Sequence, residues 1–469
     1  MRTSRKILKN IFSLSFAEIA NKGIIFITTA YLARVILPEG FGIIGLANSI
    51  LVYFLLLVNL GFNTVGTREI AVYQEKTRNY VDAIITMRSL LAFVSYIALA
   101  LITFFVIEKP ENTKLVILIC GLNLFSNAIL LDWVYQGNEK MEVIAIRQVV
   151  TSTLNLLGIL IFVHTKSDVV LAMSVTVAST MINALWMLFF YTKNYGRVKI
   201  SFDFSLWKTI LKDSIPITFS TFFITIINTL CILILSFFRN EVETGIYNAA
   251  YRVLLFVYIP SGIIQSAFFP VFSRSLTIYD RQSVYKKYFL FQSAIGVFIA
   301  ISFFTFSEFV VGIVYGRDYK DTVEVLRYLM ITSLIIYFNS SMMPPLIAWK
   351  KERKVLIAIA LAAVVNIALN FALVPQLGPK GAALTTIFSE LTFSLGLSII
   401  LIKTIQHYEF LNYLKLILFA CISCGLGYLL GLTNIYALIP FLLSFFIYVF
   451  IIFSTKIITL QEIKEYIKK

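Results

Sequence analysis

The chain has 469 residues, of which 59% are hydrophobic and 14% charged, and its mean hydropathy is +0.86. Soluble proteins carry about a quarter of charged residues, so this composition indicates a polytopic membrane protein and excludes a soluble domain. The net charge of +15 is typical of nucleic-acid binding as well as of membrane topology, and its distribution along the chain decides between the two.

Apolar runs predict the membrane-spanning helices, because a helix needs about 20 mostly apolar residues to cross a bilayer. The sequence predicts an all-α protein with about fourteen such helices and only short connections. The first run lacks a small-residue cleavage site, so we expect it to remain in the protein. The predicted spans lie near residues 11–33, 41–65, 82–107, 115–134, 143–163, 169–191, 209–238, 245–270, 288–314, 323–348, 355–374, 381–403, 414–433 and 436–454.

The positive charge alternates with the predicted connections. If the N-terminus is cytoplasmic, the cytoplasmic segments hold 26 Lys and Arg residues and the opposite connections hold 8. This positive-inside bias predicts that both termini are cytoplasmic and that the charge reports topology. We therefore expect a multi-pass membrane protein with no nucleic-acid partner. The tail 455–469 places Ile457, Leu460, Ile463 and Ile467 on one stripe, which predicts an amphipathic helix on the membrane surface.

The first predicted span contains two charges near its middle. Glu18 and Lys22 are spaced i, i+4 with the acid N-terminal, so they can form an ion pair on one helix face, beside Asn21. Deep ionisable residues usually face a bundle interior or a wet cavity. The alternative is that the pair only neutralises itself during insertion.

Other ionisable residues in the predicted spans differ in depth. Arg147, Lys212 and Arg327 lie near span ends, where we expect them to extend to the surface. Arg88 and Arg252 lie deeper, and Glu390 is deep without an ionic partner on its own helix. These positions are candidates for a polar lumen.

The sequence contains an internal repeat. Gly42 and Ala47 match Gly245 and Ala250 at an offset of 203, and Asn155 matches Asn366. We also pair the dipeptide 139–140 with 352–353. The repeat predicts two six-helix lobes of the same orientation with a site at their interface. The expected divisions are 1–195, 196–405 and 406–469, the last holding two flanking helices and the tail.

Enzymatic chemistry has few candidate residues. The two histidines, His164 and His407, lie in connections without a nucleophile nearby, and no Gly-rich phosphate loop or metal-ligand cluster is present. The four cysteines lie in apolar runs. We therefore expect no enzyme activity, no cofactor and no metal.

Four stretches carry a resemblance to a known family: YLARVILPEGFG (31–42), NLGFNTVGTREIA (59–71), WVYQGNEK (133–140) and GIYNAAYR (245–252). With them the chain resembles the Wzx-type polysaccharide flippases of the multidrug/oligosaccharidyl-lipid/polysaccharide transporter superfamily. The resemblance implies two six-helix lobes plus two flanking helices. It also implies transfer of an undecaprenyl-diphosphate-linked oligosaccharide, for O-antigen, capsule or exopolysaccharide, from the inner to the outer leaflet by alternating access.

The resemblance also suggests residue roles. It implies basic lumen residues, which we place at Lys22, Arg88 and Arg252. Members of the family often have Asp where this chain has Asn59, and they often have an acid in the seventh span. Because this chain departs from both features, we expect ion coupling here to depend on the remaining deep acids, Glu18 and Glu390. We expect Asn21 and Asn59 to line the lumen as substrate contacts. The partners implied are membrane lipid, a polysaccharide polymerase and a chain-length regulator.

Two other functions remain open. A multidrug exporter of the same superfamily would favour an acidic lumen for cationic drugs, whereas the deep charges here include three bases and two acids. A non-transporting scramblase or scaffold subunit of a polysaccharide assembly complex is the second alternative, and transport by the purified protein alone would exclude it.

Overall fold

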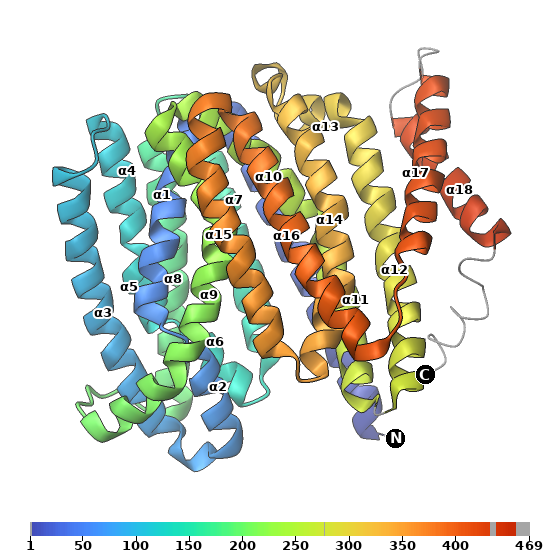
Figure 1. The fold of residues 1–469 in the computed structure, drawn as a ribbon. Coiled ribbons are helices and arrows are strands. Elements are labelled where there is room, and N and C mark those ends of the chain that lie inside the picture. The colour runs from blue at the N-terminus through green and yellow to red at the C-terminus, as the bar shows by residue number, and fades with distance from the viewer. Residues whose placement is uncertain (1, 276, 432–437, 456–469) are drawn as a thin grey trace. The chain divides into compact units, whose positions relative to one another are not determined.

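The computed structural model describes residues 2–275, 277–431 and 438–455, with side chains from residue 18 onward except at 220, 430, 431 and 438. All regular elements in this part of the chain are helical, as predicted (Figure 1). The expected amphipathic tail lies outside the described residues, apart from residue 455. The helices are α1 (Arg2–Asn59), α2 (Phe62–Val72), η1 (Gln74–Lys76), α3 (Thr77–Phe105), α4 (Glu111–Gly121), α5 (Asn123–Ile129), α6 (Asp132–Gly137), α7 (Met141–Phe162), α8 (Val169–Tyr195), α9 (Phe204–Phe238), α10 (Glu241–Val257), α11 (Ile259–Arg274), α12 (Ile278–Thr305), α13 (Ser307–Val314), η2 (Arg317–Tyr319), α14 (Thr322–Ala348), α15 (Glu352–Leu377), α16 (Pro379–Ile405), α17 (Phe410–Gly431) and α18 (Leu438–Ser454).

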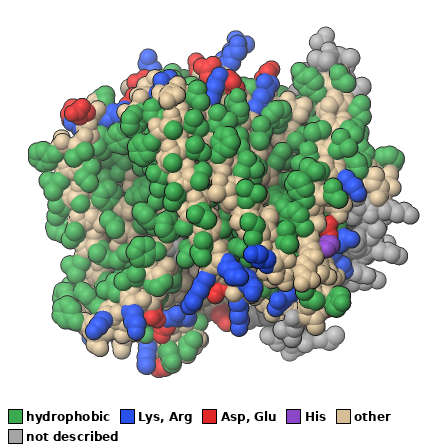
Figure 2. Space-filling model, viewed as in Figure 1, with side chains coloured by type: hydrophobic (Ala, Val, Ile, Leu, Met, Phe, Trp, Pro, Cys, Tyr) green, Lys and Arg blue, Asp and Glu red, His purple; other side chains and the backbone are tan. Residues whose placement is uncertain are grey.

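The membrane-spanning character of the chain is confirmed. Within the described residues, twelve helical runs are long and apolar enough to cross a membrane, and Ile439–Ser454 is a shorter apolar helix. The run Glu18–Val72 covers two predicted spans, so it and the shorter helix account for the fourteen that the sequence predicts. Figure 2 shows the pattern that this composition produces, with hydrophobic side chains along the helices and charges gathered at their ends.

The two first predicted spans are one long helix with a break. Helix α1 continues through residues 34–40, where we expected a loop, and only Leu37 departs from helical geometry, with φ 61° and ψ 175°. Pro38 follows directly, and a proline disfavours helical geometry in the residue before it. The break therefore kinks α1 without ending it.

Contacts between Cα atoms divide the chain into two compact units, residues 1–245 and 246–469. In the first unit, α1 packs against α4, α7 and α9, and α7 packs against α8. In the second unit, α14 packs between α12 and α16, α15 packs on α16, and α17 packs on α12 and α18. Each unit buries its own apolar core, so the helices that carry polar residues are held rigidly within a unit.

One turn occurs twice, once in each unit, and it supports the internal repeat. Glu139 and Lys350 both have positive φ, 58° and 60°. The amide of Lys140 donates to Tyr135 O at 2.8 Å, and that of Lys351 donates to Leu346 O at 2.9 Å. Both are Schellman caps that end a helix.

The twin turns also correct one predicted pairing. Glu139 corresponds to Lys350, so the offset is 211 rather than the 213 of the expected match between 139–140 and 352–353. Asn155 and Asn366 share this offset of 211. The dipeptide match was wrong because backbone geometry fixes the register, whereas exposed charged pairs recur freely.

Candidate functional site

The charges near the start of α1 form the predicted ion pair. Lys22 Nζ lies 2.9 Å from Glu18 Oε1, and the two side chains are 38% and 55% exposed. Asn21 beside them is half-buried. The pair therefore presents a neutral but strongly polar spot on the helix surface instead of being enclosed in the core.

Arg88 lies in the core of the first unit and is 1% exposed. Its guanidinium donates to Asn59 Oδ1 at 2.6 Å, to Asn63 Oδ1 at 3.2 Å and to Leu130 O at 3.2 Å. It also donates to Asn127 O. The structure thus brings together two predicted site residues, Arg88 and Asn59, and two of the guanidinium's acceptors are main-chain carbonyls.

Those acceptors stand where two helices break. Between α1 and α2, Leu60 and Gly61 have positive φ of 36° and 73°. Between α5 and α6, Leu130 is extended, and its amide donates to Asn127 O at 3.3 Å. A main-chain polar group in a membrane interior must find a partner within the protein. Arg88 supplies a donor to Leu130 O and a second donor to Asn127 O.

A second buried cation, Arg147, has partners that we did not predict. Arg147 Nη2 lies 2.8 Å from Asp132 Oδ2, and Nη1 donates to Asn183 Oδ1 at 3.3 Å. The Arg147 side chain is only 12% exposed. The expectation that it extends to the membrane surface was wrong, because an acid on α6 lies within reach inside the bundle.

An ion pair near one end and a hydrogen bond near the other join α9 to other parts of the first unit. Near the start of α9, Asp213 Oδ2 lies 2.5 Å from Arg68 Nη2. Near its end, Lys109 Nζ lies 2.6 Å from Ser236 O and 2.9 Å from Glu241 Oε1. Sequence reasoning counted Arg68 and Lys109 only as topology signals. Nothing local in the sequence marks them, because their partners are more than 100 residues away.

Arg252 on α10 differs from the other deep cations. It is half-buried beside Tyr251 and Tyr315, and Tyr315 Oη donates to Ala249 O at 2.9 Å. Neither a carboxylate nor a hydrogen-bond acceptor is found for its guanidinium among the described residues. A half-buried guanidinium without a protein anion is suited to an anionic ligand.

Glu390 on α16 has a partner on another helix. Asn339 Nδ2 of α14 donates to Glu390 Oε2 at 2.7 Å and to Glu390 O at 3.1 Å. At the adjacent position of α16, Ser389 Oγ accepts from Asn366 Nδ2 of α15 at 3.0 Å. The carboxylate is half-buried and hydrogen-bonded to an amide only, so it keeps acceptor capacity for a cation.

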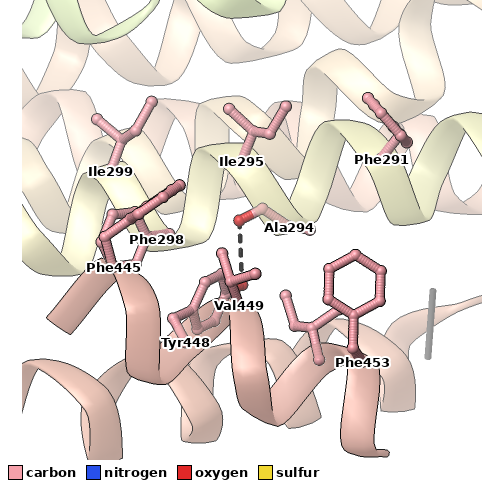
Figure 3. A pocket seen from close by; sticks show the side chains of 10 residues that line it. Phe291, Ala294, Ile295, Phe298, Ile299, Phe445, Tyr448, Val449 and Phe453 are labelled. Carbon is pink, nitrogen blue, oxygen red and sulfur yellow. Dashed lines mark hydrogen bonds between the residues drawn. The ribbon is translucent and has the colours of Figure 1, made fainter. Parts of the chain in front are cut away.

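An apolar groove lies between α12 and α18. It has a volume of about 310 Å³ and no polar lining. Phe298 and Ile299 of α12 face Phe445 and Val449 of α18, and Tyr448 Oη donates to Ala294 O at 3.0 Å across it (Figure 3). The groove is suited to a hydrocarbon chain, because every side chain around it offers only apolar surface.

The part of the chain that the structure describes offers no set of side chains for binding a metal ion. No group of three or more His, Cys, Asp or Glu side chains that could hold a metal occurs among the described residues. Cys120, Cys231, Cys421 and Cys424 do not form disulfides.

Comparison with known proteins identifies the family. Residues 7–276, more than half of the chain, match the family described as "Polysaccharide biosynthesis protein". The chain belongs to this family. It is similar to the "Putative O-antigen transporter" of Escherichia coli (strain K12), with 26% identity over 83% of this chain and 95% of that protein. A protein of the same name from Shigella dysenteriae is 24% identical over 81% of this chain and 96% of its own length.

Solved structures show the same fold. The lipid II flippase MurJ in an inward closed conformation has a TM-score of 0.75 at 15% identity, covering 94% of this chain and 97% of that chain. An inward-facing multidrug resistance MATE transporter of the MOP superfamily has a TM-score of 0.68 at 14% identity, covering 82% and 94%. The relatives are transporters, in agreement with the expectation that the chain is not an enzyme.

Proposed function

We propose that this polysaccharide biosynthesis family member is a flippase that moves an undecaprenyl-diphosphate-linked oligosaccharide from the cytoplasmic to the outer leaflet of the bacterial inner membrane. The family match and the two O-antigen transporters support a lipid-linked polysaccharide substrate. The fold shared with a lipid II flippase supports the mode of transport. The two lobes, 1–195 and 196–405, alternate in access, and 406–469 flanks them.

Arg252 carries the proposal. A lipid diphosphate has several negative charges that must cross the membrane interior, and a guanidinium can bind two phosphate oxygens at once. Arg252 is half-buried, and no carboxylate among the described side chains neutralises it. A drug exporter for cations would place an acid in such a position.

The other polar residues have supporting roles in this proposal. Lys22, with Asn21, adds a second cation that Glu18 holds in place, while Asn59 and Arg88 form the polar wall of the first unit. Glu18 and Glu390 are the coupling-ion candidates. The groove between α12 and α18 holds part of the prenyl chain while the sugars cross.

The topology and partners belong to the same proposal. Both termini face the cytoplasm, since the basic segments gather on that side. The chain delivers its product to a polysaccharide polymerase and a chain-length regulator.

The test is an export assay in a depleted strain complemented with variants. Depletion should cause undecaprenyl-diphosphate oligosaccharide to accumulate with its sugars facing the cytoplasm. Arg252→Gln should reduce export at least about tenfold at equal membrane abundance, because one charge-assisted contact is worth about 1.5–3 kcal/mol. Arg317→Gln, at an exposed cation, is the matched control and should export normally.

Other outcomes would overturn the proposal. Normal turnover of lipid-linked sugars together with drug sensitivity would identify an exporter. If the purified protein in liposomes moves no lipid-linked sugar, the chain is a subunit without transport activity.

A further inference from the structure

The twin turns have the same backbone but opposite charge. The first turn, NEKMEV (138–143), has one base and two acids, whereas the second, WKKERK (349–354), has four bases and one acid. Because a repeat of even span number places both turns on the same side of the membrane, topology demands no such difference. The fold does not demand it either, since the caps are hydrogen-bonded alike. The surplus positive charge of the second turn needs another explanation.

Trp349 joins this turn to the connection between α11 and α12. Its Nε1 donates to Phe272 O at 3.2 Å and to Ser275 Oγ at 3.3 Å, and the residue is 5% exposed. The Arg281 guanidinium lies 5.5 Å from the Trp349 ring centre. These contacts hold the second turn and the connection between α11 and α12, both basic, next to each other.

We name the resulting surface the basic platform. Its members are cations from the two joined segments: Arg274, Arg281, Lys350, Lys351, Arg353 and Lys354. Arg274, Lys350, Arg353 and Lys354 are exposed, and no platform residue forms an ion pair with a carboxylate among the described residues. Figure 2 shows Lys and Arg side chains gathered at the end of the helices where Figure 1 places the connection between α14 and α15.

We propose that the basic platform binds the phosphate groups of anionic phospholipids at the membrane surface. Arg274 of the platform is the last residue of one spanning helix, and Trp349 directly follows another. A tryptophan at the end of a spanning helix lies at headgroup level. Lipid phosphates are therefore the anions nearest to it and the most concentrated there. Clusters of four or more basic residues directly beside a spanning helix attract anionic lipid. This site is separate from the proposed transport site and does not depend on the transported substrate.

The test measures binding of short-chain lipids to the purified, delipidated protein in neutral detergent. Dioctanoyl phosphatidylglycerol should bind more tightly than dioctanoyl phosphatidylcholine. The variant K350Q/K351Q/R353Q/K354Q should bind phosphatidylglycerol at least about tenfold more weakly, because each basic side chain contributes about fivefold at an anionic surface. The control K166Q/R317Q/K320Q/K380Q removes four exposed charges from three separate connections, none of which holds four bases, and should change the affinity less than about twofold.

A reciprocal variant tests the argument from the twin turns. Glu139→Lys with Glu142→Lys gives the first turn a basic surface on the same backbone and should add a second phosphatidylglycerol site. An equal loss in both fourfold variants would show a general charge effect and overturn the proposal, as would equal affinity for the two lipids. Binding of an acidic peptide or an isolated prenyl diphosphate, with no binding of phosphatidylglycerol, would also overturn it. Unchanged thermal unfolding of each variant shows that the fold is intact.

Discussion

Gly42 and Gly245 occupy equivalent positions in the internal repeat. Each glycine packs against the main-chain segment that contains or precedes the other glycine. A Cβ at Gly42 would stand 1.9 Å from Glu241 O, and a Cβ at Gly245 would stand 1.8 Å from Pro38 O. Residues 38 and 241 are themselves separated by the repeat offset of 203. The contact is therefore reciprocal, as at a two-fold axis between identical surfaces, although one chain supplies both sides.

This contact predicts that neither glycine tolerates a methyl group. Gly42→Ala should force α1 and α10 apart and lower the free energy of unfolding by about 1–3 kcal/mol, the usual cost of overpacking. Thermal unfolding in detergent measures it. Gly262→Ala is the matched control, because a Cβ there meets no atom within 4 Å. Wild-type stability of Gly42→Ala would contradict the close approach.

Arg88 should be required for folding of the first unit. Arg88→Leu leaves the carbonyl of Leu130 without a donor and removes one of the two donors to the carbonyl of Asn127, and each unsatisfied buried group costs about 1–3 kcal/mol. We expect a large loss of folded protein in the membrane, measured by fluorescence size-exclusion chromatography. Arg88→Lys keeps the charge but cannot reach several acceptors at once, so its loss should be smaller. If Arg88→Leu folds normally and only export fails, Arg88 contacts substrate and is not a structural residue.

Asp132 and Arg147 should show coupled effects on stability. Arg147→Gln leaves the Asp132 carboxylate without its cation, and Asp132→Asn leaves the guanidinium without its anion. In a double-mutant cycle we expect a coupling energy of about 0.5–3 kcal/mol. Additive effects of the two substitutions would show that the contact contributes nothing, as many exposed ion pairs do.

Exchange of Glu18 and Lys22 separates the two explanations of that pair. The variant E18K/K22E keeps a neutral i, i+4 pair, although the reversed order is slightly less favourable. Membrane insertion, measured by glycosylation mapping, should be unchanged. Export should fall, because the proposed lumen cation has moved by one helical turn. Wild-type export would show that the pair acts only in insertion.

Asp168 predicts a pH dependence in the connection between α7 and α8. The amides of His164 and Thr165 donate to its carboxylate at 2.9 and 2.8 Å and hold its pKa below the usual range. A lowered folded pKa means that the carboxylate stabilises this turn above the unfolded pKa of about 3.9, and that the effect is lost as pH falls through the folded value. The protection of the turn's amides against hydrogen exchange, relative to an unstructured chain at the same pH, should therefore fall in acid.

Asp168→Asn is the control for that measurement. The amide oxygen still accepts the two hydrogen bonds but does not titrate, so the variant should lack the acid-dependent loss of protection. Equal acid sensitivity of both proteins would assign the effect to another group.

The fold was predictable from the sequence because membrane spans depend on apolar runs and on charge in the connections, and both are local. Pairing of Lys22 with Glu18 was predictable for the same reason, since four residues on one helix fix the geometry. The kink at Leu37 was not predicted, because Pro38 and the Glu39 and Gly40 that follow it look like a loop.

The environments of the deep cations could not be read from the sequence. Arg88 and Arg252 are equivalent by depth, yet one bonds to four acceptors and the other to none among the described residues. The difference arises from helix breaks at Gly61 and Leu130, which bring carbonyls to Arg88 from segments 25 to 42 residues away. Depth predicts that a charge needs a partner but not which partner it finds.

Two contacts of unequal exposure hold α9 within the first unit. Asp213 of α9 pairs with Arg68 of α2, and Ser236 O of α9 accepts from Lys109, which also pairs with Glu241 of α10. Displacement of α9 from the rest of the unit has to break both contacts. Dissolved ions weaken the contact of Arg68, which is 54% exposed, far more than that of Lys109, which is 13% exposed. Added salt therefore loosens the first part of α9 and leaves its last turn nearly unchanged.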